Sequence, residues 1–127
     1  QDDALARAVR IEMDTAVKPD FGFRADPALL ESVRDNLLGN AVAYVPSGGT
    51  ISMRARQEEI EVSNAAPALH TEDIANFGQR FWRKEAQGAG HAGLGLALAA
   101  AAAKALRMTL TYELRDGVLH AALRWNV

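Results

Sequence analysis

The segment "ADPALLESVRDNLLGNAVAYVPSGG", residues 25–49, carries the clearest sign of regular structure in this chain. Apolar residues recur within it at helical spacing, at Leu30, Val33, Leu37, Leu38 and Ala41. Asp26 is a good N-cap residue, and Pro27 suits the first turn of a helix. The stop "PSGG" follows at residues 46–49, so we predict a helix that ends near Val45.

Short runs with the composition of strands lie on both sides of this helix. Before it come "AVRIEMD" (8–14) and "DFGFRAD" (20–26), separated by Pro19, and after it come "TISMRARQ" (50–57) and "EIEVSN" (59–64). Apolar residues alternate with polar ones in the second pair, which is typical of half-buried strands. We therefore expect two short strands first and a hairpin after the helix.

The second half of the chain repeats the order of helix and hairpin after a long connection. Residues 65–92 show no sustained period, apart from a short helix predicted around 71–77. An alanine-rich helix is predicted from Leu94, and two strands at 107–114 and 118–127 flank the turn signal "RDG". The order of elements predicts an α+β two-layer sandwich, with a mixed, mostly antiparallel sheet packed against helices.

Composition limits the classes of protein to which the chain can belong. Its 127 residues, 49% of them apolar and 24% charged, suit one globular domain over residues 1–127. A net charge of −2 predicts neither nucleic-acid binding nor direct membrane contact. The absence of cysteine excludes disulfides and thiolate metal sites. Because the chain begins with Gln1 and no signal peptide follows, we expect a piece of a longer protein.

Three polar residues of the first helix form one row beside its apolar stripe. Asn36, Asn40 and Tyr44 are spaced at i, i+4 and i+8. Asparagine is a mediocre helix former and needs hydrogen-bond partners when it is buried. The row is either a set of bridges to neighbouring backbone or a polar wall. In a wall, amide oxygens could ligate Mg²⁺ and the tyrosine could flank a ring.

The glycine-rich stretch "GAGHAG", residues 88–93, matches the dinucleotide pattern G-x-G-x-x-G. That pattern requires a strand immediately before it, and "FWRKEAQ" is not a strand. What remains is a loop that enters a helix, whose first N–H groups and dipole attract phosphate oxygens. On this stretch alone, a phosphate site and a mobile loop before a core helix remain equal alternatives.

Four separated motifs together identify a family. "NLLGNAVAY" (36–44), "EVSNAAPAL" (61–69), "QRFWR" (79–83) and "HAGLGLAL" (91–98) occur in this order. The chain thereby resembles, over nearly its whole length, the ATP-binding catalytic domain of sensor histidine kinases. That family shares a superfamily with DNA gyrase B, Hsp90 and MutL. The resemblance implies an α/β sandwich of a mixed sheet and three helices.

The resemblance assigns roles in binding ATP and Mg²⁺ to the asparagines and the tyrosine. Asn40 matches the asparagine that ligates Mg²⁺ between the ATP phosphates, and Asn36 matches one that faces the same phosphate–metal cluster. Tyr44 matches a tyrosine that packs on the adenine side. Asn64 stands where most members have an aspartate that accepts a hydrogen bond from the adenine amino group.

The resemblance also implies an ATP lid over about residues 65–92. Gly93, Leu94 and Gly95 match the second glycine box, where the lid and a helix N-terminus meet the phosphates. Phe81 and Arg83 match the phenylalanine box of the lid, whose basic residue reaches toward phosphate. His91 replaces a glycine in the phosphate loop, where it either contacts nucleotide or is solvated.

Some positions depart from the family's pattern. Asn64 keeps an acceptor oxygen but loses the carboxylate charge, and Ala66 and Ala68 stand where glycines are usual. Ala43 replaces a basic residue, and Gly78 replaces the first phenylalanine of the lid box. These changes predict weaker but retained nucleotide binding and a different path for the loop after Asn64.

The function implied is that of a cytoplasmic kinase domain in a two-component system, part of a membrane-bound receptor. It would bind ATP and Mg²⁺ and donate the γ-phosphate to a histidine on a separate phosphoacceptor domain, upstream of a response regulator. No general base is evident, although Asp35 and Glu31 lie nearby. His70, His91 and His120 lack the sequence context of a phosphoacceptor. Two alternatives remain: a docking module defective in nucleotide binding, and an anti-sigma-factor serine kinase of the same superfamily.

Overall fold

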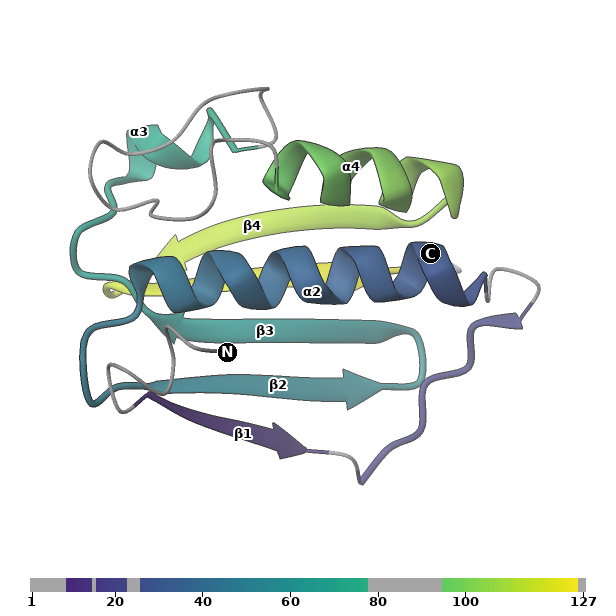
Figure 1. The fold of residues 1–127 in the computed structure, drawn as a ribbon, viewed down its shortest axis with the longest axis horizontal. Helices are drawn as coiled ribbons and strands as arrows, with labels where there is room; N and C mark the ends of the chain where they lie inside the picture. The colour runs from purple at the N-terminus through teal and green to yellow at the C-terminus, as the bar shows by residue number, and fades with distance from the viewer. Residues whose placement is uncertain (1–8, 15, 23–25, 78–94, 126–127) are drawn as a thin grey trace.

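The computed structural model describes residues 9–14, 16–22, 26–77 and 95–125. In chain order its elements are β1 (Arg10–Asp14), α2 (Pro27–Tyr44), β2 (Thr50–Arg56), β3 (Glu59–Ala65), α3 (Thr71–Ile74), α4 (Gly95–Ala105), β4 (Thr109–Arg115) and β5 (Val118–Arg124) (Figure 1). No helix in these ranges is long and apolar enough to cross a membrane.

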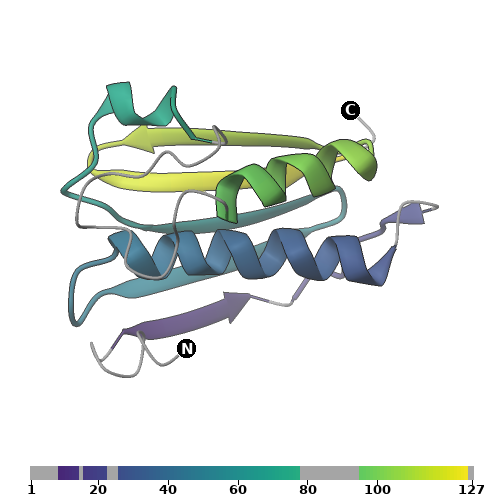
Figure 2. The same ribbon diagram turned by 45° about the horizontal axis from the view of Figure 1, so that its top comes forward.

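The five strands form one sheet in the order β1-β2-β3-β5-β4. β1 runs parallel to β2, because α2 crosses over between them, and the other three pairs are antiparallel. The helices lie on one face of this sheet, with α2 and α4 side by side and antiparallel (Figures 1 and 2). The prediction of a mixed, mostly antiparallel sheet packed against helices is confirmed.

The first long helix begins and ends where its sequence predicts. Asp26 caps it, because its Oδ1 accepts hydrogen bonds from Ala28 N–H at 3.0 Å and Leu29 N–H at 3.3 Å. At the other end Val45 N–H donates to the carbonyl of Ala41 at 2.9 Å, and Val45 itself is extended. The cap residue and the stop after residue 45 therefore set the length of α2.

The main core lies between α2, α4 and the sheet. Its buried residues come from all three, with Val33, Leu37 and Ala41 on α2, Ala102 and Ala103 on α4, Leu106 directly after α4, and Ile51, Val62, Ala121 and Leu123 on the strands. Alanines on α4 let the two helices pack closely against each other. The alternating pattern of the strands thus buries one face of the sheet and leaves its other face to polar side chains.

The prediction of a strand over residues 20–26 is wrong for the part that the structure describes. Asp20, Phe21 and Gly22 form a turn, in which Asp20 Oδ1 accepts from Gly22 N–H at 3.2 Å and Gly22 has a φ of +61°. Trp125 Nε1 donates to the carbonyl of Asp20, and the Phe21 ring lies 4.7 Å from the Trp125 ring. Contact with Trp125, directly after β5, thus decides this conformation.

The other predicted elements are present with small shifts of their ends. The predicted helix at 71–77 is a helix over Thr71–Ile74 followed by a turn, and α4 begins at Gly95. β4 begins two residues later than predicted, at Thr109, and ends one residue later, at Arg115, whereas β5 ends earlier than predicted, at Arg124. Asp116 and Gly117 at their turn both have positive φ, 53° and 77°, as the hairpin signal requires.

Candidate functional site

Asn36 is the first residue of the predicted polar row on α2, and it differs from Asn40 in its environment. Asn36 is half-buried, and its Nδ2 donates to the carbonyl of Ser32 at 2.7 Å, one helical turn back. This bond is the structural role that an asparagine within a helix commonly takes. Asn36 Oδ1 makes no hydrogen bond with any residue that the structure describes. The residue can therefore still accept a hydrogen bond or ligate a cation through its oxygen.

Asn40, one turn further along α2, lies deeper in the fold. Its side chain is only 8% exposed, and it sits beside Ala41 and Leu37 of the main core. Within the described ranges no residue forms a hydrogen bond with the Asn40 carboxamide. The enclosed polar atoms that lack a hydrogen-bond partner in the described structure are the Tyr112 hydroxyl and His120 Nδ1, and the Asn40 amide is not one of them. The Asn40 amide is therefore available to a ligand without being an enclosed, unsatisfied group.

Tyr44 ends α2 inside a second buried cluster. This cluster joins Tyr44 to Ala66, Leu69 and Leu119, which are all buried. The Tyr44 ring is stacked with the Phe77 ring at a centroid distance of 6.3 Å and an interplanar angle of 21°. Because Ala66 directly follows β3, this cluster brings the end of α2 against the end of β3.

Asn64 is the second buried asparagine of the site. It lies on β3 between Ile51 of β2 and Leu119 of β5, with 4% of its surface exposed. Its Nδ2 donates to the carbonyl of Ala65 at 2.9 Å. Its Oδ1 has no hydrogen-bond partner among the residues that the structure describes. The carboxamide is thus held by its nitrogen with its oxygen left to accept.

The start of α4 completes the described part of the site. α4 runs antiparallel to α2 and begins at Gly95, next to the C-terminal half of α2, where Asn40 and Tyr44 lie (Figures 1 and 2). The first N–H groups of a helix have no partner within the helix and carry a partial positive charge. This helix end can therefore attract an anion to the side of α2 that bears the asparagines.

Other predicted residues lie outside the described ranges. These are Arg83, His91, Gly93 and Leu94, together with Phe81 and Gly78 of the lid box. Their roles stay predictions from the resemblance. The described residues thus bring together Asn36, Asn40, Tyr44, Asn64 and Gly95 on neighbouring elements.

The loop after Asn64 avoids the conformation that alanine resists. Neither Ala66 nor Ala68 has a positive φ, and Leu69 N–H donates to the carbonyl of Ala66 at 3.0 Å to close a turn. Ala66 N–H donates to the carbonyl of Gly117 at 2.8 Å, which ties the loop to the β4–β5 hairpin. The alanines are thus compatible with an ordered loop path that needs no glycine.

The two carboxylates considered as a general base face away from the site. Asp35 Oδ1 accepts from Arg34 Nε at 3.1 Å, and Glu31 Oε2 lies 3.6 Å from Arg34 NH2. All three side chains are half or more exposed. Across the described ranges, no group of three His, Cys, Asp or Glu side chains could hold a metal ion. A cation here would depend on amide oxygens and on a ligand's own charges.

An aromatic contact at this site was not predicted from the sequence. Phe77 meets Tyr112 of β4 edge to face at 5.0 Å and 83°, in addition to its stack with Tyr44. The Tyr112 hydroxyl is buried without a hydrogen-bond partner in the described structure, and burial raises the pKa of Tyr112. These three rings come from parts of the chain far apart in sequence. Phe77, the apolar residue at the end of the helix predicted over 71–77, was the one feature of the sequence that could have indicated this group of rings.

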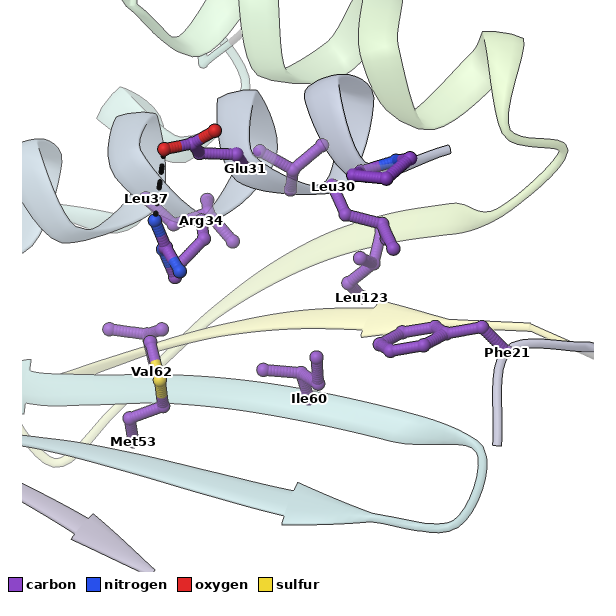
Figure 3. A pocket seen from close by; sticks show the side chains of 11 residues that line it. Phe21, Leu30, Glu31, Arg34, Leu37, Met53, Ile60, Val62 and Leu123 are labelled. Carbon is purple, nitrogen blue, oxygen red and sulfur yellow. Dashed lines mark ion pairs between the residues drawn. The ribbon is translucent and has the colours of Figure 1, made fainter. Parts of the chain in front are cut away.

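A cavity of about 480 Å³ lies elsewhere, under the N-terminal half of α2 (Figure 3). Most of its lining residues are apolar, and they include Phe21, Leu30 and Ile60. Its two charged lining residues, Glu31 and Arg34, form an ion pair with each other. None of the predicted site residues lines it. The cavity is therefore separate from the polar site at the other half of α2.

A sequence model of one family matches most of the chain. The family is described as "Histidine kinase-, DNA gyrase B-, and HSP90-like ATPase", and the match covers residues 25–120. The sensor protein QseC of Salmonella typhi is 30% identical to the chain over 100 residues. Those residues make up 78% of this chain and 22% of that protein, so the chain spans about a fifth of this relative.

Two solved structures illustrate the fold that this chain shares. The mycobacterial sensor histidine kinase MprB has a TM-score of 0.74 at 19% identity, covering 97% of this chain and 88% of that one. Full-length ShkA, solved in complex with AMPPNP, has a TM-score of 0.72 at 20% identity, covering 96% of this chain and 27% of that one. At these identities the likeness shows the fold, and it agrees with the α+β sandwich described above.

Proposed function

Because the chain belongs to the histidine kinase-, DNA gyrase B- and HSP90-like ATPase family, we propose that it binds Mg·ATP and donates the γ-phosphate to a histidine on a separate domain. The proposed site lies between the C-terminal half of α2, the end of β3 and the start of α4. The lid predicted over about residues 65–92 would cover it.

One observation carries this proposal. Asn40 and Asn64 are 8% and 4% exposed, lie on elements whose ends meet, and keep hydrogen-bonding atoms without partners among the described residues. Two amides with available hydrogen-bonding atoms in one small region can together contact a polar ligand, which supports a binding role for them. A nucleotide suits both, since it offers donors on its base and negative oxygens on its phosphates.

Asn64 supports recognition of adenine. Its Nδ2 donates to the carbonyl of Ala65, so its Oδ1 is left to accept a hydrogen bond, for which the amino group of adenine would be a donor. The bond is neutral, because the residue is an amide and not a carboxylate. Neutral hydrogen bonds are weaker than charge-assisted ones by about 1 kcal/mol, so binding is expected to be weaker than with aspartate.

Asn40 and the start of α4 support the binding of phosphates. Mg²⁺ prefers oxygen ligands and is usually bound by few protein groups together with substrate phosphates, which suits an amide such as Asn40. When bound, the ion would neutralise charge on the phosphates. The N–H groups at the start of α4, from Gly95 onward, would donate to phosphate oxygens, as helix N-termini commonly do. Asn36, through its Oδ1, would help to position the same group.

Transfer of the phosphate relies on position more than on proton removal. Phosphoryl transfer is catalysed mainly by alignment and charge neutralisation, and Asp35 and Glu31 are both paired with Arg34 on the exposed side of α2. We therefore assign no general base to the chain. The acceptor would be a histidine of the receptor's phosphoacceptor domain, in the cytoplasm, with a response regulator downstream.

A calorimetric titration with ATP, with and without Mg²⁺, tests the proposal. Wild-type protein should bind Mg·ATP with a dissociation constant below millimolar, and Asn40→Ala should lose the part of the affinity that depends on Mg²⁺. Asn76→Ala is the matched control, since the Asn76 amide donates to Glu72 and has no assigned role. No binding by the wild type, or equal Mg²⁺ dependence in both variants, would contradict the proposal.

A docking module without nucleotide binding is the second candidate. Ala43, Ala66 and Ala68 favour it, because each replaces a residue that the resemblance assigns to phosphate contact or to the loop's path. Such a module would leave Asn40 and Asn64 without a ligand. A chain that binds its phosphoacceptor domain equally well with and without Mg·ATP, and transfers no phosphate to it, would identify this function.

A further inference from the structure

β1 is an edge strand that differs from the rest of the sheet in its exposure. All five of its residues are exposed, including Ile11 at 41% and Met13 at 59%. Its neighbour among the described strands is β2 alone, and no described helix covers it (Figures 1 and 2). An edge strand with exposed apolar side chains is a template for pairing with another strand.

On the side away from β2, the backbone of β1 carries N–H and C=O groups that pair with no described residue. Arg10 N–H donates to the carbonyl of Gly49 at 3.0 Å, so the polar groups of Arg10 point toward β2. Because these groups alternate in direction along a strand, those of Ile11 and Met13 point toward the free edge. The edge therefore offers two N–H donors and two C=O acceptors to an incoming strand.

The side chains of β1 divide between the two faces of the sheet. Ile11 and Met13 pair with Ile51 and Met53 of β2, which places them on the face that carries the helices. Arg10, Glu12 and Asp14 lie on the opposite face. An apolar hollow of about 410 Å³ adjoins the first face and includes Met13, Val17 and Met53 in its lining.

The sequence of this strand, Arg-Ile-Glu-Met-Asp, is nearly self-complementary when read in the opposite direction. Suppose that a second copy of the strand pairs with it in antiparallel orientation, with the two Glu12 residues opposite each other. Arg10 of each copy then lies opposite Asp14 of the other copy, and Ile11 of each copy lies opposite Met13 of the other. The backbone N–H and C=O groups of Ile11 and Met13 point away from β2. Ile11 of one copy and Met13 of the other can therefore exchange backbone hydrogen bonds. Only Glu12 meets a like charge, its own counterpart.

We propose that β1 is a self-association surface, at which two copies of this chain pair antiparallel through Arg10–Asp14 and form one continuous ten-stranded sheet. Charges on an edge strand usually oppose such pairing, but here four of the five positions complement each other. The two-fold axis passes beside Glu12, and both helix layers lie on the same side of the joined sheet. The contact is isologous, so it closes at two copies.

A cysteine cross-link tests the register directly, because the chain contains no cysteine. Glu12→Cys places two thiols across the axis at a Cα separation of about 4.5 Å, which a disulfide can span. Arg10→Cys is the matched control on the same face, with its two copies about 14 Å apart in this register. Under mild oxidation, Glu12→Cys should form covalent dimers at least ten times faster than Arg10→Cys. Equal rates would overturn the proposal.

Sedimentation of the 127-residue chain tests the association without cross-linking. A pairing of five residues buries little area, so we expect dimers to form only between about 10 μM and about 1 mM. Met13→Glu should abolish them, whereas Leu98→Glu adds the same charge at a comparably exposed apolar residue on α4, 54% exposed, and should not. The proposal would be overturned if the wild type stayed monomeric up to about 1 mM, or if both variants lost dimer formation to the same extent.

Discussion

The Phe77 ring lies between two tyrosines, 6.3 Å from Tyr44 at the end of α2 and 5.0 Å from Tyr112 on β4. Tyr44 is the residue proposed to pack on the adenine side, and Phe77 is the last described residue before residue 95. These ring contacts connect the turn after α3 to the proposed nucleotide site.

Replacing Phe77 should therefore affect both stability and binding. Phe77→Leu keeps an apolar side chain but removes the aromatic contacts, which are worth about 0.5–1.5 kcal/mol each. We expect urea unfolding to show a loss of about 1–2 kcal/mol and titration to show a several-fold weaker affinity for Mg·ATP. Glu72→Gln, at an exposed position of the same short helix, is the control and should change neither. Unchanged affinity in Phe77→Leu would separate the ring cluster from nucleotide binding.

Asn64→Asp should raise the affinity for ATP and lower the stability of the protein without nucleotide. A carboxylate at this position would accept a stronger, charge-assisted bond from adenine, which is worth about 1 kcal/mol or a fivefold gain in affinity. The same charge would be buried in the unbound protein, where Asn64 is 4% exposed, so the melting temperature without nucleotide should fall. Calorimetric titration and thermal unfolding measure the two effects. A weaker affinity for ATP in this variant would contradict the role given to Asn64.

Tyr112→Phe should stabilise the protein. The hydroxyl is buried without a partner among the described residues, so its removal avoids a cost of about 1 kcal/mol or more while the ring contact with Phe77 stays. Burial raises the pKa of Tyr112, so only the unfolded chain loses this proton as the pH rises above about 10. Wild-type stability should therefore fall there more steeply than that of the variant. Urea unfolding at pH 7 and above pH 10 checks both statements, and a less stable variant at pH 7 would show that the hydroxyl has a partner.

Asp26→Ala tests the local origin of α2. The Asp26 carboxylate caps two backbone N–H groups, and loss of such a cap costs about 1 kcal/mol. Asp26→Ser keeps a capping oxygen and should recover most of the loss in urea unfolding. Since the cap lies at the opposite end of α2 from Asn40, the affinity for Mg·ATP should not change. Equal stability of the alanine and serine variants would refute the capping role.

Much of this fold follows from local sequence. α2 has a cap, a helical period and a stop within one continuous segment, and the last hairpin has a turn whose two residues both adopt positive φ. Such features depend on neighbours within a few residues, so they can be identified without the tertiary structure. The same is true of the asparagine row, whose spacing alone puts Asn36, Asn40 and Tyr44 on one side of a helix.

The tertiary structure decided what depends on residues far apart in the chain. Residues 20–22 form a turn because Trp125 binds the carbonyl of Asp20, and β1 lies at the edge because α2 crosses over to give a parallel pair with β2. Burial separated the asparagines: Asn36 bonds to its own helix, whereas Asn40 is 8% exposed and its amide bonds to no described residue. Phe77 met Tyr44 and Tyr112 only through the packing of α3 on the sheet. The local sequence pattern determined which helices and strands form. Packing determined which of their polar groups remained available for a ligand, because burial and hydrogen-bond pairing are properties of the assembled layers.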